Sequence, residues 1–202
     1  CITGLNKMLK ILHRINTIKL LIKTPIEFGV EVDIRSNNNN LIMHHDPFEK
    51  GDLFEEWIKF YKHKFLILNV KEEGLEGPLL KLMKKHNINN FFFLDQSFPF
   101  LRKTALLGER RCAVRISEYE SIETVLSLSS MVDWVWVDCF SDFPLDVDDD
   151  LRLKNAGFKI CIVSPELQGR LDRNHVLEFR RKIEALDIIG DAVCTKYPDL
   201  WD

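Results

Sequence analysis

The sequence has no excess of basic residues and no long hydrophobic run. Its 28 Lys and Arg residues are balanced by 31 Asp and Glu, which gives a formal net charge of −3. Electrostatic attraction to nucleic acid or to an anionic membrane is therefore not expected to be its main task. The apolar runs are far shorter than the roughly 20 residues that a membrane-spanning helix needs. We expect no transmembrane segment and no nucleic-acid partner.

Cysteine pairs with the spacing of a zinc or redox site are also missing. The five cysteines are widely spaced, and four lie in or beside apolar runs: Cys112, Cys139, Cys161 and Cys194. We interpret them as buried thiols in a reducing compartment rather than as a zinc site or a disulfide framework. The N-terminal segment CITGLNKMLKIL lacks the apolar core of a secretory signal. These features predict a cytoplasmic protein.

The composition that is present indicates one globular domain. Hydrophobic residues make up 46% of the 202 residues and charged residues 29%, which excludes a disordered chain. Residues 1–7 precede the first apolar run and are predicted to be an N-terminal extension. Residues 8–202 are predicted to form the single domain.

Short apolar runs alternate with amphipathic stretches along the chain. The runs are rich in Val, Ile, Phe and Trp and predict strands at 9–13, 28–34, 41–44, 65–71, 91–94, 112–116, 134–138, 158–163 and 191–195. Hydrophobic residues at helical spacing predict helices at 52–63, 75–86, 97–107, 119–130 and 174–187. Asp52 is the expected N-cap of the first of these helices.

The number of repeats predicts the architecture. The run 41–44 follows 28–34 across the stretch Asn37–Asn40, and this spacing indicates a hairpin or strand extension. Eight strand–helix repeats remain, which predicts an α/β protein with a compact (β/α)8 barrel of the TIM type. An open doubly wound sheet is the alternative, but its glycine-rich phosphate-binding motif is missing.

Polar residues stand near the C-terminal ends of the apolar runs, where a parallel barrel places its chemistry. Glu31 and Asp33 are two residues apart in a strand and therefore share a face, as do Asn69 and Lys71. Unpaired buried charges cost several kcal/mol. A hard divalent cation, Mg²⁺ or Ca²⁺, bound by two carboxylates and an amide carbonyl would compensate them. The alternative is a structural ion-pair network with Arg14, Arg35 or Lys71.

Two histidines flank this carboxylate pair. His13 ends the first run, and His45 lies in the segment HHDPF. An imidazole with an ordinary pKa near 6.5 can take and give protons at neutral pH. Arg115, near the end of a later run, is a candidate to bind an anionic substrate or to pair with a carboxylate.

These residues resemble the glycerophosphodiester phosphodiesterase family, within the phospholipase-C-like phosphodiesterase superfamily, and a compact bacterial subgroup of it. The matching motifs occur in order and are His13-Arg14, Glu31-Val32-Asp33, His45-Asp46, Asn69-Val70-Lys71 and the segment DAVCTKYP at 191–198. The resemblance implies a barrel of the phospholipase-C-like type. It also implies metal-dependent hydrolysis of a small phosphodiester.

The resemblance assigns a role to each matching residue. His13 and His45 would be the acid–base pair, and Glu31, Asp33 and Asn69 would bind the divalent cation. Arg14 and Lys71 would contact the phosphate. The chain differs from the family motif at two positions, with Ile15 where a glycine is usual and Asn69 where an acidic ligand is usual.

We therefore hypothesise a metal-dependent hydrolase of a glycerophosphodiester-like or related phosphodiester, acting through two histidines. The differences at Ile15 and Asn69 motivate an alternative, a catalytically weakened or inactive barrel that binds a phosphorylated ligand or a partner. A third hypothesis is a different barrel enzyme that uses Lys71 as a Schiff-base amine. The oligomeric state stays open.

Overall fold

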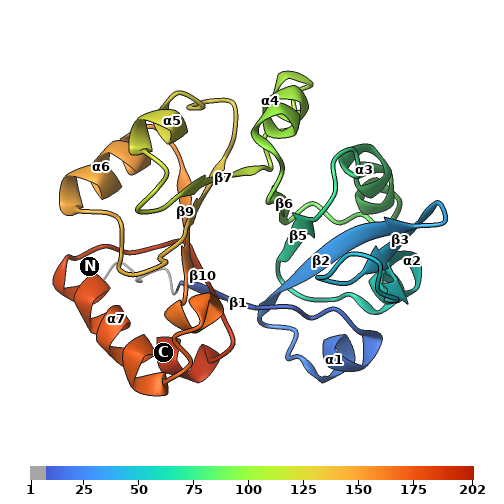
Figure 1. Ribbon diagram of the computed structural model, residues 1–202, viewed down its shortest axis with the longest axis horizontal. Coiled ribbons are helices and arrows are strands. Elements are labelled where there is room, and N and C mark those ends of the chain that lie inside the picture. The colour runs from blue at the N-terminus through green and yellow to red at the C-terminus, as the bar shows by residue number, and fades with distance from the viewer. Residues whose placement is uncertain (1–7) are drawn as a thin grey trace, which may run out of the picture.

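The computed structural model describes residues 8–202, and their core is a barrel of parallel strands (Figure 1). Within these residues, eight strands form the wall: β1 (Leu9–Leu12), β2 (Gly29–Asn37), β5 (Leu66–Val70), β6 (Phe91–Leu94), β7 (Ala113–Ile116), β8 (Trp134–Val137), β9 (Lys159–Val163) and β10 (Ala192–Thr195). Their order is β6-β5-β2-β1-β10-β9-β8-β7, with every neighbouring pair parallel. The predicted (β/α)8 architecture is confirmed.

The ring is weakest between β6 and β7. A single parallel bridge joins Phe93 to Cys112, supported by a 2.9 Å hydrogen bond from the Phe93 N–H to the Arg111 carbonyl. Most other neighbouring strands share a ladder of three or more residue pairs. We call this junction the β6–β7 seam.

Alternating residues of the strands fill the inside of the barrel. The inward residues form one buried cluster that includes Ile11, Ile67, Phe92, Trp134 and Cys161. The outward residues form a separate, larger cluster with the surrounding helices. This division follows from the two-residue period of a strand that is covered on both faces.

The helices lie around the outside of the strands, as Figure 1 shows. They are α1 (Ile18–Lys23), α2 (Phe54–Trp57), α3 (Glu76–Lys85), α4 (Phe98–Leu106), α5 (Ile122–Leu126), α6 (Val147–Asn155) and α7 (Arg173–Ala185). Three 3₁₀ turns complete the layer: η1 (Ile58–Phe60), η2 (Pro165–Gln168) and η3 (Pro198–Trp201). Several helices span fewer than two turns, which is how about 200 residues suffice for a barrel that typically takes about 250.

The predicted hairpin is confirmed. β2 runs past the barrel rim to Asn37 and pairs antiparallel with β3 (Asn40–Met43). Asn38 and Asn39 both have positive φ angles, 48° and 64°, which a tight two-residue hairpin turn requires. β3 in turn pairs with the short β4 (Asp52–Leu53).

The prediction of one continuous helix over 52–63, capped by Asp52, is wrong. Asp52 lies in β4, and the helical part is split into α2 and η1. The Asp52 carboxylate instead accepts a 3.0 Å hydrogen bond from the N–H of Ile18, the first residue of α1. Asp52 therefore stabilises the N-terminus of a helix distant in sequence, one that the sequence pattern did not predict.

The interpretation of the cysteines as buried thiols is confirmed for the four that lie among residues 8–202. Cys112, Cys139, Cys161 and Cys194 are free and buried. The predicted extension 1–7, which contains Cys1, lies outside the described residues. Among residues 8–202, no helix has the length and apolar character needed to cross a membrane.

Candidate active site

Five predicted site residues meet at the C-terminal mouth of the barrel. Glu31 and Asp33 point inward from β2 and are fully buried. Asn69 points inward from the neighbouring β5, paired in register with Asp33, and Lys71 follows at the strand end. His13 follows β1, and its N–H donates to the Thr195 carbonyl at 3.1 Å. The expected shared faces of the two strand-end pairs are thus confirmed.

Both oxygens of the Glu31 carboxyl group contact polar hydrogens. The backbone N–H of Arg14 donates to Oε2 at 2.7 Å, and the Asn69 Nδ2 amide donates to Oε1 at 2.9 Å. His13 Nε2 lies 3.8 Å from Oε2. Arg14 has a φ of 56°, a left-handed conformation that is uncommon for a residue with a side chain. This turn is what aims its N–H at Glu31.

Asp33 is held by a residue that the sequence analysis missed. Asn16 forms a two-way contact with it: Asn16 Nδ2 donates to Asp33 Oδ2 at 2.8 Å, and the Asp33 N–H donates to Asn16 Oδ1 at 2.9 Å. Lys71 Nζ lies 3.4 Å from Asp33 Oδ1, and Arg14 Nε lies 3.7 Å from Oδ2. The motif HRIN carried the signal for Asn16, a polar residue in the turn directly after the first strand.

Burial changes the proton affinity of the central groups. Burial, together with the nearby charge of Asp33, raises the pKa of Glu31 well above its ordinary value despite the opposing hydrogen bonds from Arg14 and Asn69. Burial, followed by the positive charges of Arg14, Lys196 and Lys71, lowers the pKa of His13 to about 3. The 3.8 Å contact between them is therefore not an ion pair at neutral pH, because the imidazole is uncharged. Lys196, next to the last strand, is a cation of this site that the sequence analysis did not assign.

His45 lies on the loop after β3. Arg35, on β2, holds this loop at the rim of the barrel through two hydrogen bonds. Arg35 Nε and Nη2 both donate to the His45 carbonyl, at 3.1 and 2.9 Å. The His45 Nδ1 atom is 2.8 Å from Asp46 Oδ1, and the His45 side chain is 40% exposed. Among residues 8–202, the His45 ring makes no hydrogen bond or ion pair with the buried carboxylates, and its recorded partner is Asp46. Arg35 itself does not contact the buried carboxylates, in contrast to the pairing considered for it.

Asp95 connects Lys71 to Arg115. Lys71 Nζ lies 3.0 Å from Asp95 Oδ2, and Arg115 Nη2 donates to Asp95 Oδ1. Arg115 Nη1 is also 3.5 Å from Asp138 Oδ2. Although burial opposes it, the charges of Lys71 and Arg115 hold the pKa of Asp95 below its ordinary value. Arg115 is therefore one side chain away from the central cluster, and it pairs with carboxylates.

The donor atoms suit a hard cation. Asp33 Oδ1 and Asn69 Oδ1 are buried and have no hydrogen-bond partner among residues 8–202. Two carboxylates and an amide carbonyl are ligands that Mg²⁺ and Ca²⁺ favour. A cation beside Glu31 would also reverse the effect of burial on its pKa. Within the described part of the chain, no group of three or more His, Cys, Asp or Glu side chains is arranged for metal binding. The third ligand of this set would be the amide of Asn69.

Comparison with solved structures shows that this barrel fold also occurs in two phosphodiesterases. A glycerophosphodiester phosphodiesterase of Agrobacterium tumefaciens superposes with a TM-score of 0.67 at 12% identity, covering 96% of this chain and 97% of that one. A glycerophosphoryl diester phosphodiesterase of Parabacteroides distasonis superposes with a TM-score of 0.64 at 13% identity, covering 96% and 84%. No protein-family model matches the sequence, and no curated protein matches it significantly.

The same fold also occurs in an enzyme with other chemistry. A mutant tryptophan synthase α-subunit of Pyrococcus furiosus superposes with a TM-score of 0.58 at 13% identity, covering 94% of this chain and 86% of that one. The chain thus has the barrel fold of the glycerophosphodiester phosphodiesterases over nearly its whole length. Because one fold hosts many reactions, the activity has to be argued from the site.

Proposed function

We propose that the protein is a metal-dependent phosphodiester hydrolase that acts on a glycerophosphodiester-like substrate with two histidines. The observation that carries this proposal is the convergence of His13, Glu31, Asp33, Asn69 and Lys71 at the mouth of the barrel. Parallel barrels of this kind hold their active sites at this end. The shared fold with two phosphodiesterases supports the same reaction class.

Glu31, Asp33 and Asn69 would hold Mg²⁺ or Ca²⁺, and the bound cation would offset charge on the phosphoryl oxygens. Asn69 Oδ1 has no hydrogen-bond partner among the described residues, and Asp33 Oδ1 has only the 3.4 Å ion-pair contact with Lys71, which supports this ligand set. Lys71 and Arg14 already lie within 3.4 and 3.7 Å of Asp33, where a phosphate bound at the cluster would meet their positive charges.

The two histidines are suited to opposite proton transfers. His13 Nε2 lies 3.8 Å from Glu31 Oε2, next to the proposed cation, where an imidazole could accept a proton from the attacking oxygen. His45 Nδ1 contacts the Asp46 carboxylate at 2.8 Å, which can orient its ring. We assign His13 as the base and His45 as the acid that protonates the leaving oxygen.

The proposal is tested with a panel of phosphodiesters in the presence of Mg²⁺, Mn²⁺ or Ca²⁺. Each histidine removed singly, His13→Ala or His45→Ala, should lower kcat by roughly 10²–10⁴-fold. His86→Ala is the matched control, because His86 lies at the end of α3 on the outer layer. No turnover with any diester and metal, or full activity in the His13→Ala/His45→Ala double variant, would refute the assignment.

One observation favours a second candidate, a barrel that binds a phosphorylated ligand without cleaving it. Asn69 donates a hydrogen bond to Glu31, and Lys71 and Arg14 lie beside Asp33, so both buried carboxylates already have partners. A thermal-unfolding comparison with EDTA, Mg²⁺ and Ca²⁺ separates the two candidates. A specific ion at 100 times its Kd raises stability by about 2.7 kcal/mol. No shift with any ion, together with turnover gained in Asn69→Glu, would favour the second candidate.

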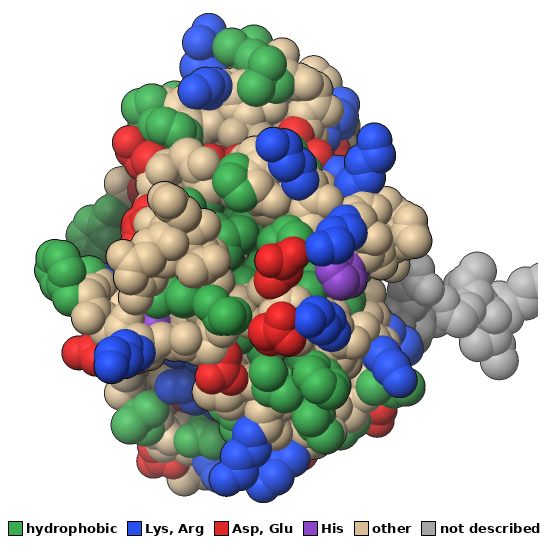
Figure 2. Space-filling model, turned by 90° about the vertical axis from the view of Figure 1, so that its right-hand side faces the viewer, with side chains coloured by type: hydrophobic (Ala, Val, Ile, Leu, Met, Phe, Trp, Pro, Cys, Tyr) green, Lys and Arg blue, Asp and Glu red, His purple; other side chains and the backbone are tan. Residues whose placement is uncertain are grey.

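We also propose that the chain acts in the cytoplasm on a small phosphodiester and not on nucleic acid. Four buried free thiols support a reducing compartment. Positive and negative side chains are interspersed on the face formed by α1, α2, α3 and the β2–β3 hairpin (Figure 2), as expected from the small net charge. Cell fractionation and a filter-binding assay with DNA and RNA test these two statements.

A further inference from the structure

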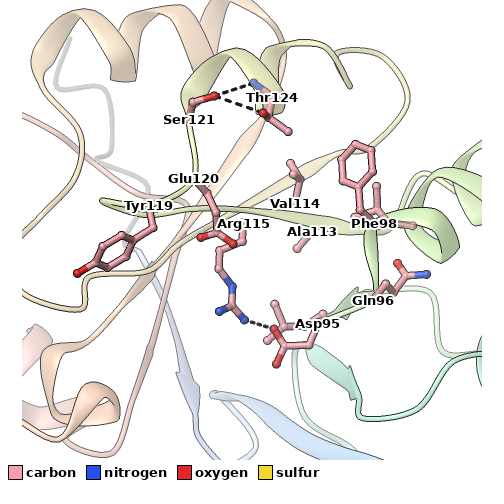
Figure 3. A pocket seen from close by; sticks show the side chains of 12 residues that line it. Asp95, Gln96, Phe98, Ala113, Val114, Arg115, Tyr119, Glu120, Ser121 and Thr124 are labelled. Carbon is pink, nitrogen blue, oxygen red and sulfur yellow. Dashed lines mark hydrogen bonds and ion pairs between the residues drawn. The ribbon is translucent and has the colours of Figure 1, made fainter.

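The β6–β7 seam opens into a cleft of about 620 Å³ beside the candidate active site. Beyond the Phe93–Cys112 bridge the two strands share no ladder, and the segments that follow them lead away to α4 and α5. The cleft lies between these two helices, as seen from close by in Figure 3. Its volume is in the range of roughly 300–1,000 Å³ that small-molecule sites have.

The floor of the cleft is apolar. Leu94, Leu101, Ala113 and Val114 line it, and each is 5% exposed or less. Phe98, at the start of α4, stands at the side with 49% of its surface exposed. An apolar group placed here would leave water and cover the ring of Phe98, which is favourable by about 25 cal/mol for each Å² buried.

The opposite wall is polar but offers few free groups. It comes from Tyr119, Glu120 and Ser121, between β7 and α5, and from Thr124 in α5. The Ser121 hydroxyl already accepts a hydrogen bond from the Thr124 N–H as the N-cap of α5, and the Glu120 carboxylate accepts one from the Ser117 hydroxyl. Gln96 Oε1 is the buried acceptor of the lining that has no partner among residues 8–202, so most of the cleft's polar groups are already engaged.

A chain of charges connects the cleft to the catalytic centre. Asp95 and Arg115 line the cleft and point toward each other in Figure 3. Asp95 Oδ2 is 3.0 Å from Lys71 Nζ, which in turn is 3.4 Å from Asp33 Oδ1. One ester arm of a phosphodiester bound at Lys71 would thus run past Asp95 and Arg115 into the cleft.

We propose that the cleft at the β6–β7 seam binds an apolar arm of the substrate, so that the preferred phosphodiesters carry one alkyl, acyl or aryl alcohol. This inference rests on the proposed function, because it takes the phosphate to lie at Lys71. It narrows the substrate class from diesters of small polar alcohols to amphipathic diesters.

The test compares two phosphate monoesters as ligands, hexyl phosphate and glycerol 3-phosphate, by calorimetry and by backbone amide shifts. Each buried methylene adds roughly fourfold to affinity. Hexyl phosphate should therefore bind at least about tenfold more tightly than glycerol 3-phosphate. Compared with glycerol 3-phosphate, hexyl phosphate should cause additional changes in backbone amide chemical shift, and these should lie in the cleft, at residues 94–98 and 113–124. Binding does not depend on turnover, so a failed hydrolysis assay with glycerophosphocholine leaves this result interpretable.

Two variants test whether the preference for hexyl phosphate depends on the cleft. Phe98→Asp should abolish the preference for hexyl phosphate, and Thr124→Trp should do the same by filling the cleft from the opposite wall. Leu106→Asp is the matched control, since Leu106 is on the same helix, is 60% exposed and does not line the cleft. Equal affinity for the two ligands, binding of neither, shifts outside the cleft, or an undiminished preference in both folded variants would overturn the proposal.

Discussion

Asn69 determines how the two buried carboxylates of the site are balanced. Its amide nitrogen donates to Glu31 while its amide oxygen has no partner among the described residues. An acidic residue here would add a negative charge to an already buried pair, and only a cation would balance it. The amide makes the cluster tolerable without a cation, and as a ligand it would hold a divalent cation less tightly than a carboxylate would.

Asp95 is predicted to position Lys71 for the reaction. Its φ of 59° is left-handed, a conformation that asparagine also accepts readily, so Asp95→Asn should keep the backbone and remove only the charge. Lys71 and Arg115 would lose their shared carboxylate and bind a phosphate more tightly but in a less defined position. We expect a lower KM and a kcat reduced by about tenfold.

Steady-state kinetics, which give KM and kcat separately, test this prediction, with Asp133→Asn as the control. Asp133 pairs with Arg110 at 2.8 Å at the start of β8, the end of the strand opposite the mouth. Unchanged kcat in Asp95→Asn would show that Lys71 does not need this carboxylate.

The sequence predicted the inward pairs of the site but not the residues that hold them. Glu31 and Asp33, like Asn69 and Lys71, follow from the two-residue period of a strand. Asn16 and Asp95 sit in turns after strands, and the direction of their side chains depends on backbone angles that no periodic pattern specifies. Asp95 directly follows the apolar run 91–94, a position that marks a strand end but does not indicate its partners Lys71 and Arg115.

At the level of elements, hydrophobic spacing located helices but did not determine their ends. The stretches 75–86, 97–107 and 174–187 became α3, α4 and α7 within about two residues, the usual uncertainty of helix ends. The stretch 52–63 does not form one helix because Asp52 lies in β4. There it pairs with Met43 of β3 and accepts a hydrogen bond from the N–H of Ile18 in α1. Such long-range contacts override local spacing.

The loop after β8 is predicted to weaken in acid because of Glu118. Its carboxylate accepts hydrogen bonds from the N–H groups of Phe140, Ser141 and Asp142. Partial burial alone would raise its pKa, but the backbone N–H donors and the Ser141 hydroxyl lower the pKa to about 2. A lowered folded-state pKa means that the stabilisation is full above about pH 5 and is lost as the pH falls toward 2.

Glu118→Gln should therefore destabilise the protein by about 1 kcal/mol at pH 7, a modest value because the group is exposed. The difference from the parent should disappear near pH 2. Denaturant unfolding at several pH values measures it, with Glu120→Gln as a neighbouring control. A pH-independent difference would show that the charge of Glu118 is not responsible.

For the whole molecule, the aromatic layer inside the barrel is predicted to carry much of the stability. The Trp134 ring lies 4.9 Å from that of Phe92 and 5.3 Å from that of Phe65. Trp134→Ala would leave a cavity that the surrounding strands cannot fill and should cost about 3–5 kcal/mol. Trp134→Phe, which keeps a ring, should cost less than half of this, and denaturant midpoints would show the difference. An equal loss of stability in the two variants would argue against a packed interior.

The barrel as a whole was predictable from the number of strand–helix repeats, whereas the β6–β7 seam was not. β6 (FFFL) is wholly apolar and β7 (AVRI) is apolar except for Arg115, so neither strand is unusual in sequence. In the structure the two share only the Phe93–Cys112 bridge, and the segments after them lead to α4 and α5. Repeat counting gives the topology, and only three-dimensional packing shows where the wall opens.

The pairing of β1 with β10 has a consequence for how the chain folds during synthesis. Leu9 through Leu12 align with Ala192 through Thr195, so the ladder of β1 is complete only after β10, about 180 residues further along the chain, has been synthesised. Contacts between residues so far apart in sequence form slowly. Because β1 lies between β2 and β10, the wall beside Glu31 and Asp33 closes only when this late pairing has formed.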